Sequence, residues 1–112
     1  NEAKNPGEVT LCVSNGYKKK FYLNENFNQL PQSIRDELKI MCVLYTEDVG
    51  GILELVFDED GTLQFKTSCE ENDFLYDEIG SVLKIKQYQN EKRDLLEALE
   101  MFYRIIYLGE GL

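Results

Sequence analysis

The chain has 112 residues and a formal net charge of −9, with 43% hydrophobic and 12% aromatic residues. This length supports one hydrophobic core, so we expect a single domain over residues 1–112, with residues 1–7 as a loose lead-in. The negative charge disfavours direct binding to a nucleic-acid backbone or to an anionic membrane. No apolar run approaches the roughly 18 residues of a membrane span.

Histidine is absent from the sequence, which removes the commonest general base and a common zinc ligand. The three cysteines, Cys12, Cys42 and Cys69, are too widely spaced for a zinc motif and odd in number for a disulfide framework. We expect them to be buried thiols of a cytoplasmic protein, since the N-terminus also lacks an apolar signal-peptide core. We expect no catalytic residue, no cofactor and no enzymatic activity.

The first predicted hairpin joins an alternating strand to the stretch YKKKFYL. A two-residue Asn-Gly loop would turn two lysines into the apolar face of the hairpin. A three-residue loop over residues 14–16 instead places Val13 opposite Tyr17 and puts Gly16 at the left-handed third position, so we predict this loop. The lysines suit an edge strand; the alternative is a basic patch that pairs with the acidic segment of another copy. One face of the first strand is predicted to carry Val9, Leu11 and Val13.

Residues 30–51 predict a helix that begins near Pro31 and stops at Gly50 or Gly51. Its apolar positions recur at helical spacing. The face they form comprises Ile34, Leu38, Met41, Cys42 and Tyr45.

A second hairpin follows, with a predicted three-residue loop over residues 59–61. This loop places Phe57 opposite Leu63 and Glu54 opposite Lys66, an opposite-charge pair across the two strands. Its final glycine again occupies the left-handed position.

From Ser68 onward the sequence predicts helix, with Ser68 and Glu71 as a capping box or Asp73 as the rival cap. Two helices meeting within the polar residues 86–94 are favoured over one long helix, because about 35 residues is long for a helix in a small domain. Gly109 ends the second. The first helix has an apolar stripe of Leu75, Ile79, Val82 and Leu83. The second has Leu95, Leu99, Phe102 and Ile106, widened by Leu96, Tyr103 and Tyr107.

This order, ββαββα(α), predicts an α+β fold. We expect a four-stranded antiparallel sheet made of two hairpins, with helices packed on one face.

The acidic residues concentrate in residues 47–78, where eleven acids and one base give a net charge of −10. A solvated surface that keeps the chain soluble is one interpretation, and a surface that binds a basic partner is the other. Glu47 and Asp48 lie at a predicted helix C-terminus, where carboxylates oppose the helix dipole. The candidate partner-binding surface comprises Glu47, Asp48, Glu70, Glu71, Asp73, Asp77 and Glu78.

A metal site is a weaker alternative. Neither register of DEDG at residues 58–61 matches an EF-hand loop. The glycine pair at residues 50–51 follows a helix rather than opening one, unlike a phosphate-binding loop. A weak divalent-cation site is conceivable among Glu47, Asp48, Asp58 and Asp60.

The last predicted helix has apolar residues over more than half of its circumference. Either the sheet and first helix bury this surface, or it forms the seam of a homodimer. The seam would comprise Leu95, Leu99, Phe102, Tyr103, Ile106 and Tyr107.

The segments MCVLYTEDVGGILELVFDEDG and DFLYDEIGSVLKIK resemble an uncharacterised family of small acidic bacterial proteins, a domain of unknown function. The resemblance covers residues 10–108. It implies a bacterial cytosolic protein, but no catalytic or binding residue carries over.

The sequence therefore does not assign a function. We expect a non-catalytic cytosolic protein-interaction module, with a homodimer through the last helix as one form of it. The first alternative is an acidic inhibitor or immunity-type protein that binds a basic partner through residues 47–78, and the second is the carboxylate cation site.

Overall fold

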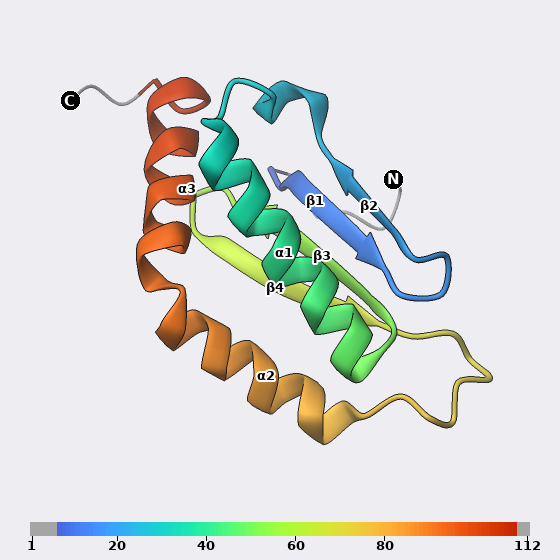
Figure 1. The fold of residues 1–112 in the computed structure, drawn as a ribbon. Helices are drawn as coiled ribbons and strands as arrows, with labels where there is room; N and C mark the ends of the chain where they lie inside the picture. The colour runs from blue at the N-terminus through green and yellow to red at the C-terminus, as the bar shows by residue number, and fades with distance from the viewer. Residues whose placement is uncertain (1–6, 110–112) are drawn as a thin grey trace.

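The computed structural model describes residues 7–109, so most of the predicted lead-in lies outside the described residues. It has the predicted α+β fold, with an antiparallel sheet and helices in the expected order (Figure 1). The elements are β1 (Val9–Asn15), β2 (Lys20–Leu23), the short 3₁₀ helix η1 (Glu25–Phe27), α1 (Gln32–Val49), β3 (Ile52–Phe57), β4 (Leu63–Ser68), α2 (Glu78–Glu91) and α3 (Arg93–Ile106).

The four strands follow the order β2-β1-β3-β4, so each hairpin contributes one central and one edge strand. The two hairpins meet where β1 pairs antiparallel with β3. Helix α1 lies across the sheet in Figure 1. The central strands supply much of the core because they are covered by the helices on one face.

A bulge in β1 changes which side chains face the helices. The register against β3 shifts between Thr10 and Cys12, so Leu11 is the extra residue. Leu11 and Cys12 are both buried, and Ser14 rather than Val13 is the next buried side chain. The predicted alternation of Val9, Leu11 and Val13 therefore holds only as far as Leu11, since a bulge moves the rest of the strand by one side-chain position.

The predicted three-residue loop of the first hairpin is wrong. Asn15 pairs with Lys20, which leaves residues 16–19 as a four-residue loop. The Asn15 side chain accepts the N–H groups of Tyr17 and Lys18, and Lys19, not Gly16, has the positive φ of 53°. Gly16 is instead needed for a close backbone approach, because a Cβ on it would lie 2.8 Å from the carbonyl oxygen of Gly51.

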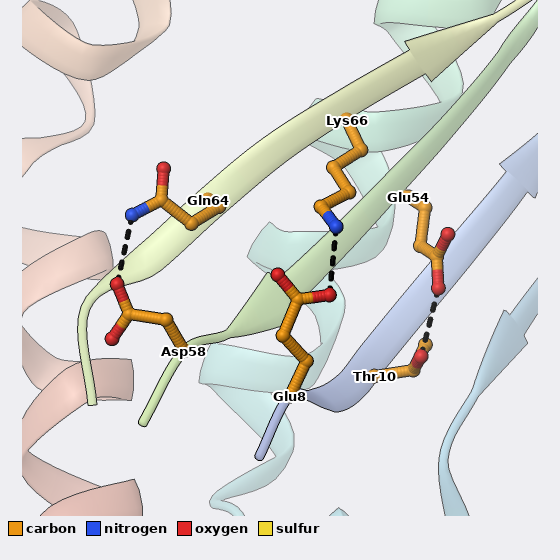
Figure 2. A network of polar contacts seen from close by, with 6 residues as sticks. All are labelled: Glu8, Thr10, Glu54, Asp58, Gln64 and Lys66. Atoms are coloured by element: carbon orange, nitrogen blue, oxygen red, sulfur yellow. Dashed lines mark hydrogen bonds and ion pairs between the residues drawn. The ribbon is translucent and has the colours of Figure 1, made fainter. Parts of the chain in front are cut away.

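The second hairpin has the predicted register and loop. Phe57 pairs with Leu63 and Glu54 with Lys66, and Gly61 has a φ of 84°. The ion pair of Lys66, however, is made with Glu8, at 2.7 Å. Glu54 instead accepts a hydrogen bond from Thr10, at 2.7 Å. Figure 2 shows these polar contacts on the sheet face opposite α1.

Helix α1 begins after Pro31 and ends at Gly50, as predicted. Its inner face packs on β1, where Cys42 Sγ lies 3.8 Å from Cys12 Sγ. Burial raises the pKa of the Cys12 thiol well above its ordinary value. The expectation of three buried thiols is wrong for Cys69, which is exposed because it follows the last paired residue of β4.

A stack of aromatic rings joins η1, β3 and α3. Phe27 lies 5.7 Å from Phe57 and 5.2 Å from Tyr107, measured between ring centroids. Tyr103 stacks on Phe57 at 4.3 Å. These contacts place α3 against the sheet, so most of its apolar side chains are buried inside the fold.

The last third of the chain has two helices, as favoured, which meet at Lys92. The predicted start of the first one is wrong. Ser68 pairs with Ile52 as the end of β4, so its backbone belongs to the sheet and neither it nor Asp73 caps the helix. Asp77 is the cap, and its Oδ1 accepts the N–H of Gly80 at 2.8 Å.

Candidate interaction surface

The loop between β4 and α2 is tied to the tip of the first hairpin. Tyr17 Oη donates to Asp73 Oδ2 at 2.6 Å and accepts the N–H of Glu70 at 2.9 Å. The side chain of Asp73 also accepts the N–H of Leu75. Figure 1 shows the loop as a long excursion beyond the end of the sheet. These contacts give the loop a defined conformation, although it contains no helix or strand.

A second set of contacts ties the start of α2 to α1. Ser81 Oγ lies 2.5 Å from Tyr45 Oη and accepts a hydrogen bond from Tyr76 Oη at 3.0 Å. Ser81 is 3% exposed. Gly51 makes room for this arrangement, because a Cβ there would lie 2.6 Å from the Tyr76 ring.

The Ser81 contacts decide which side of α2 meets the protein. Ser81 and Tyr88 face inward and are buried. At 100° per residue, the three residues of the predicted stripe that lie on the helix, Ile79, Val82 and Leu83, then fall on the outer side. Phe74 (91% exposed) and Leu75 (94%) are exposed in the loop before the helix. We call these two residues together with Ile79 (77%), Val82 (54%) and Leu83 (62%) the α2 face.

Acidic residues lie close in the chain to the first residues of the α2 face. Glu70, Glu71 and Glu78 are exposed, and all three lie within a few residues of Phe74 or Ile79 in the chain. Asp73 and Asp77 add two carboxylates that also hold the loop and cap the helix. Five of the seven acids predicted to bind a partner therefore accompany an apolar surface that the sequence analysis did not assign to binding.

The other two predicted acids are placed elsewhere. Asp48 Oδ2 lies 2.7 Å from Lys84 Nζ, and this contact raises the pKa of Lys84. The ion pair explains a carboxylate at the C-terminus of α1, because a lysine on α2 offsets the unfavourable helix dipole. Glu47 lines a groove between α1 and the first hairpin.

The predicted dimer seam on α3 is mostly inside the fold. Leu95, Leu99 and Tyr103 are buried, and Phe102 and Tyr107 are partly buried against the core. Ile106, at 53% exposed, is the seam residue that faces solvent. The sheet and α1 cover the rest, so these side chains do not form a free surface.

The four residues of the conceivable cation site lie at opposite ends of β3. Glu47 and Asp48 are near the end of α1, whereas Asp58 and Asp60 belong to the loop after the strand. A six-residue strand spans about 20 Å. Within residues 7–109, no three or more His, Cys, Asp or Glu side chains are grouped so that they could hold a metal ion.

The groove beside Glu47 is a cavity of about 620 Å³. Helix α1 contributes Lys39, Val43, Thr46 and Glu47, and the first hairpin contributes residues 14–16 and 19–21. At its base, Ser14 Oγ and Thr46 Oγ1 are 2.9 Å apart and buried. The sequence offered no signal for this groove, because its two walls come from separate elements.

The comparison with known families matches residues 8–111 to a family of unknown function, DUF6145. The chain belongs to this family. The expected resemblance to a domain of unknown function is thereby confirmed, and DUF6145 carries no assigned activity that could be transferred to the α2 face or the groove. Neither the curated proteins nor the solved structures yield a match.

The helices of the described residues are too short or too polar to span a membrane.

Proposed function

We propose that this protein is a non-catalytic protein-interaction module that binds a basic, amphipathic segment of another protein through the α2 face. The observation that carries the proposal is the exposure of five large apolar side chains on an anchored loop and helix. Contiguous exposed apolar residues with a polar border are typical of protein-binding sites.

Hydrogen bonds anchor the loop that carries Phe74 and Leu75, so the exposure of these side chains is part of the folded structure. Tyr17 holds the loop through Asp73 and Glu70, while Ser81 holds the first turns of α2 against Tyr45. Hydrogen bonds thus keep Phe74 and Leu75 in solvent at 91% and 94% exposure. A partner would find the surface already ordered, so less conformational entropy is lost on binding.

Charge favours a basic partner over a second copy. Five acids border the α2 face and Lys86 lies on the same side of the helix, which gives a local net charge of −4. A second copy docked acid end to acid end would bring like charges together, whereas a partner with lysine or arginine around an apolar stripe complements the surface. The border comprises Glu70, Glu71, Asp73, Asp77 and Glu78.

The same charge supports a second candidate, an acidic inhibitor or immunity-type protein. In that case the basic partner surface would be the active or binding site of another protein, which the acidic loop covers. Residues 70–78 hold five acids and no base, which favours recognition of such a site through charge complementarity.

The proposal places the protein in the cytoplasm of a bacterium. The three cysteines, all free thiols, support a reducing compartment, and the absence of histidine supports a non-catalytic role.

Binding can be tested with a short helical peptide of leucine and lysine, labelled for fluorescence anisotropy. We expect saturable binding that weakens as salt is added. Replacing Ile79 and Leu83 by glutamine should weaken it at least tenfold, whereas the same change at Ile40 and Leu44, exposed on α1, should not. Equal binding of a leucine-glutamate peptide would refute the proposal.

A charge-matched comparison tests the acidic border separately. The triple variant Glu70→Lys, Glu71→Lys and Glu78→Lys should bind the basic peptide much more weakly than the wild type. The triple variant Glu25→Lys, Asp60→Lys and Glu97→Lys changes the net charge equally at exposed positions elsewhere and should bind almost normally. Light scattering that shows a dimer lost in the Ile79/Leu83 variant would instead identify a second copy as the occupant.

A further inference from the structure

The groove between α1 and the first hairpin has the size of a small-molecule site. Its volume of about 620 Å³ falls within the range of roughly 300–1,000 Å³ that is usual for ligand pockets. Phe21 and Val43 provide an apolar lining, and the remaining residues apart from Gly16 are polar or charged.

The charged side chains of the groove are not used in the ion pairs of the fold. The ion pairs of the described residues join Lys66 to Glu8, Lys84 to Asp48 and Lys92 to Glu37. None of them includes Lys19, Lys39 or Glu47, three of the four charged residues that line the groove. Two cations and one anion are therefore available to a ligand.

Lys20 also lines the groove, but its position in β2 sets it apart. It alternates with Phe21, which pairs with the inward-facing Ser14. Its side chain therefore belongs to the opposite sheet face, so we do not count its charge among those available to a ligand.

The hydroxyl groups of Ser14 and Thr46 determine which hydrogen bonds the base of the groove can make with a ligand. Thr46 Oγ1 has two carbonyl acceptors in its own helix, Val43 O at 3.1 Å and Cys42 O at 3.4 Å. When its single hydrogen is donated to one of them, the hydrogen between the two hydroxyls comes from Ser14. In that arrangement Ser14 Oγ has lone pairs and no further hydrogen, so the base accepts hydrogen bonds from a ligand.

We propose that this groove binds a small amino-acid-type zwitterion. The ligand's carboxylate would lie between the ammonium groups of Lys19 and Lys39. Its ammonium group would face Glu47 and the acceptor oxygen of Ser14, and its side chain would lie along Phe21 and Val43. The arrangement complements each charged or polar group that the groove presents.

The test is a nitrogen–proton NMR titration of the full chain with L-glutamate, L-leucine and inorganic phosphate. We expect saturable shifts of the amides of Gly16, Val43 and Thr46 with one or both amino acids. Lys39→Gln and Glu47→Gln should each weaken binding at least tenfold. Lys86→Gln and Glu97→Gln, exposed on α2 and α3, are the matched controls and should leave it unchanged.

Two results would overturn the proposal. One is the absence of saturable shifts with either amino acid. The other is an equal response to phosphate that Glu47→Gln leaves unchanged, which would mean simple anion binding by surface lysines. Binding of the leucine-lysine peptide at the α2 face is measured independently, so either proposal can fail without the other.

Discussion

The hydroxyl oxygens of Tyr45 on α1 and Ser81 on α2 lie 2.5 Å apart in the interior of the protein. Tyr76, in the loop before α2, donates to the same Ser81 oxygen. A small polar residue thus faces inward on α2, and the larger apolar residues Ile79, Val82 and Leu83 face solvent. One hydrogen-bonded contact orients the helix that carries the proposed binding surface.

Replacing Ser81 by alanine should destabilise the protein by about 1–3 kcal/mol, because the buried Tyr45 hydroxyl loses its partner. The measurement is urea unfolding followed by circular dichroism. In the double variant with Tyr45→Phe, the loss should be smaller than the sum of the single losses, since the two changes remove the same contact. Strict additivity would show that the contact does not hold the helices together.

High pH should destabilise the fold. Burial raises the pKa of Tyr45, Tyr88 and Tyr103 above the ordinary value of 10. The stability contributed by a raised pKa is fully present below the unfolded value and is lost as pH rises toward the folded one. Stability should thus fall above about pH 10, by at most about 1.4 kcal/mol per pH unit for each tyrosine. Cys12, with its raised pKa, should begin this loss near pH 9.

The measurement is urea unfolding from pH 7 to 11. Tyr45→Phe should reduce the slope above pH 10, because that variant has one fewer buried phenol to protect from ionisation. The conclusion would be contradicted by identical slopes in the two proteins.

Two leucines from similar sequence stripes should respond very differently to substitution. Leu99 on α3 is 1% exposed and Leu83 on α2 is 62% exposed. Leu99→Ala should cost about 2–5 kcal/mol through lost packing and a cavity, whereas Leu83→Gln should change stability by less than about 0.5 kcal/mol. Thermal and urea unfolding of both variants provide the measurement, and a large loss in Leu83→Gln would mean that α2 buries its stripe.

The two glycines after α1 should also differ. Gly51 has a φ of 72°, and a Cβ there would meet the Tyr76 ring and the Ser68 carbonyl oxygen at 2.6 and 2.7 Å. Gly50 has a φ of 80° and open space around it. Gly50→Ala should cost about 1–3 kcal/mol in backbone strain alone, and Gly51→Ala should cost about 1–3 kcal/mol more through overpacking. Equal losses in urea unfolding would show that Tyr76 yields to the added methyl group.

The register of the second hairpin was predictable from the sequence, whereas the register of the first was not. The loop at residues 59–61 was predicted because its glycine and apolar alternation agree on one register. The first hairpin offered the same signals, yet Asn15 closes a longer loop through its own side chain. A bulge at Leu11 also shifts the pattern in β1. Hydrophobic periodicity does not reveal side-chain hydrogen bonds or bulges, so the sequence did not predict either feature.

The proposed sites differ in the same way. The acids at residues 70–78 and the stripe containing Ile79 and Leu83 were visible in the sequence, which indicated an acidic surface and an apolar helix face. Because periodicity shows that a face exists but not what covers it, the direction of that face was open. The groove is lined by residues about 25 positions apart, on α1 and β2. A local sequence pattern cannot show that such distant residues lie side by side.

Local sequence signals specify the α+β class, the order of elements, the second hairpin and both ends of α1. These follow from local rules of turn chemistry, capping and periodicity. They do not specify that α3 is covered while the stripe of α2 is exposed, or that Asp48 is paired with Lys84 while Glu47 lines a groove. The physical reason is that burial and pairing depend on contacts between elements far apart in the chain, here above all the contact of Tyr45 with Ser81.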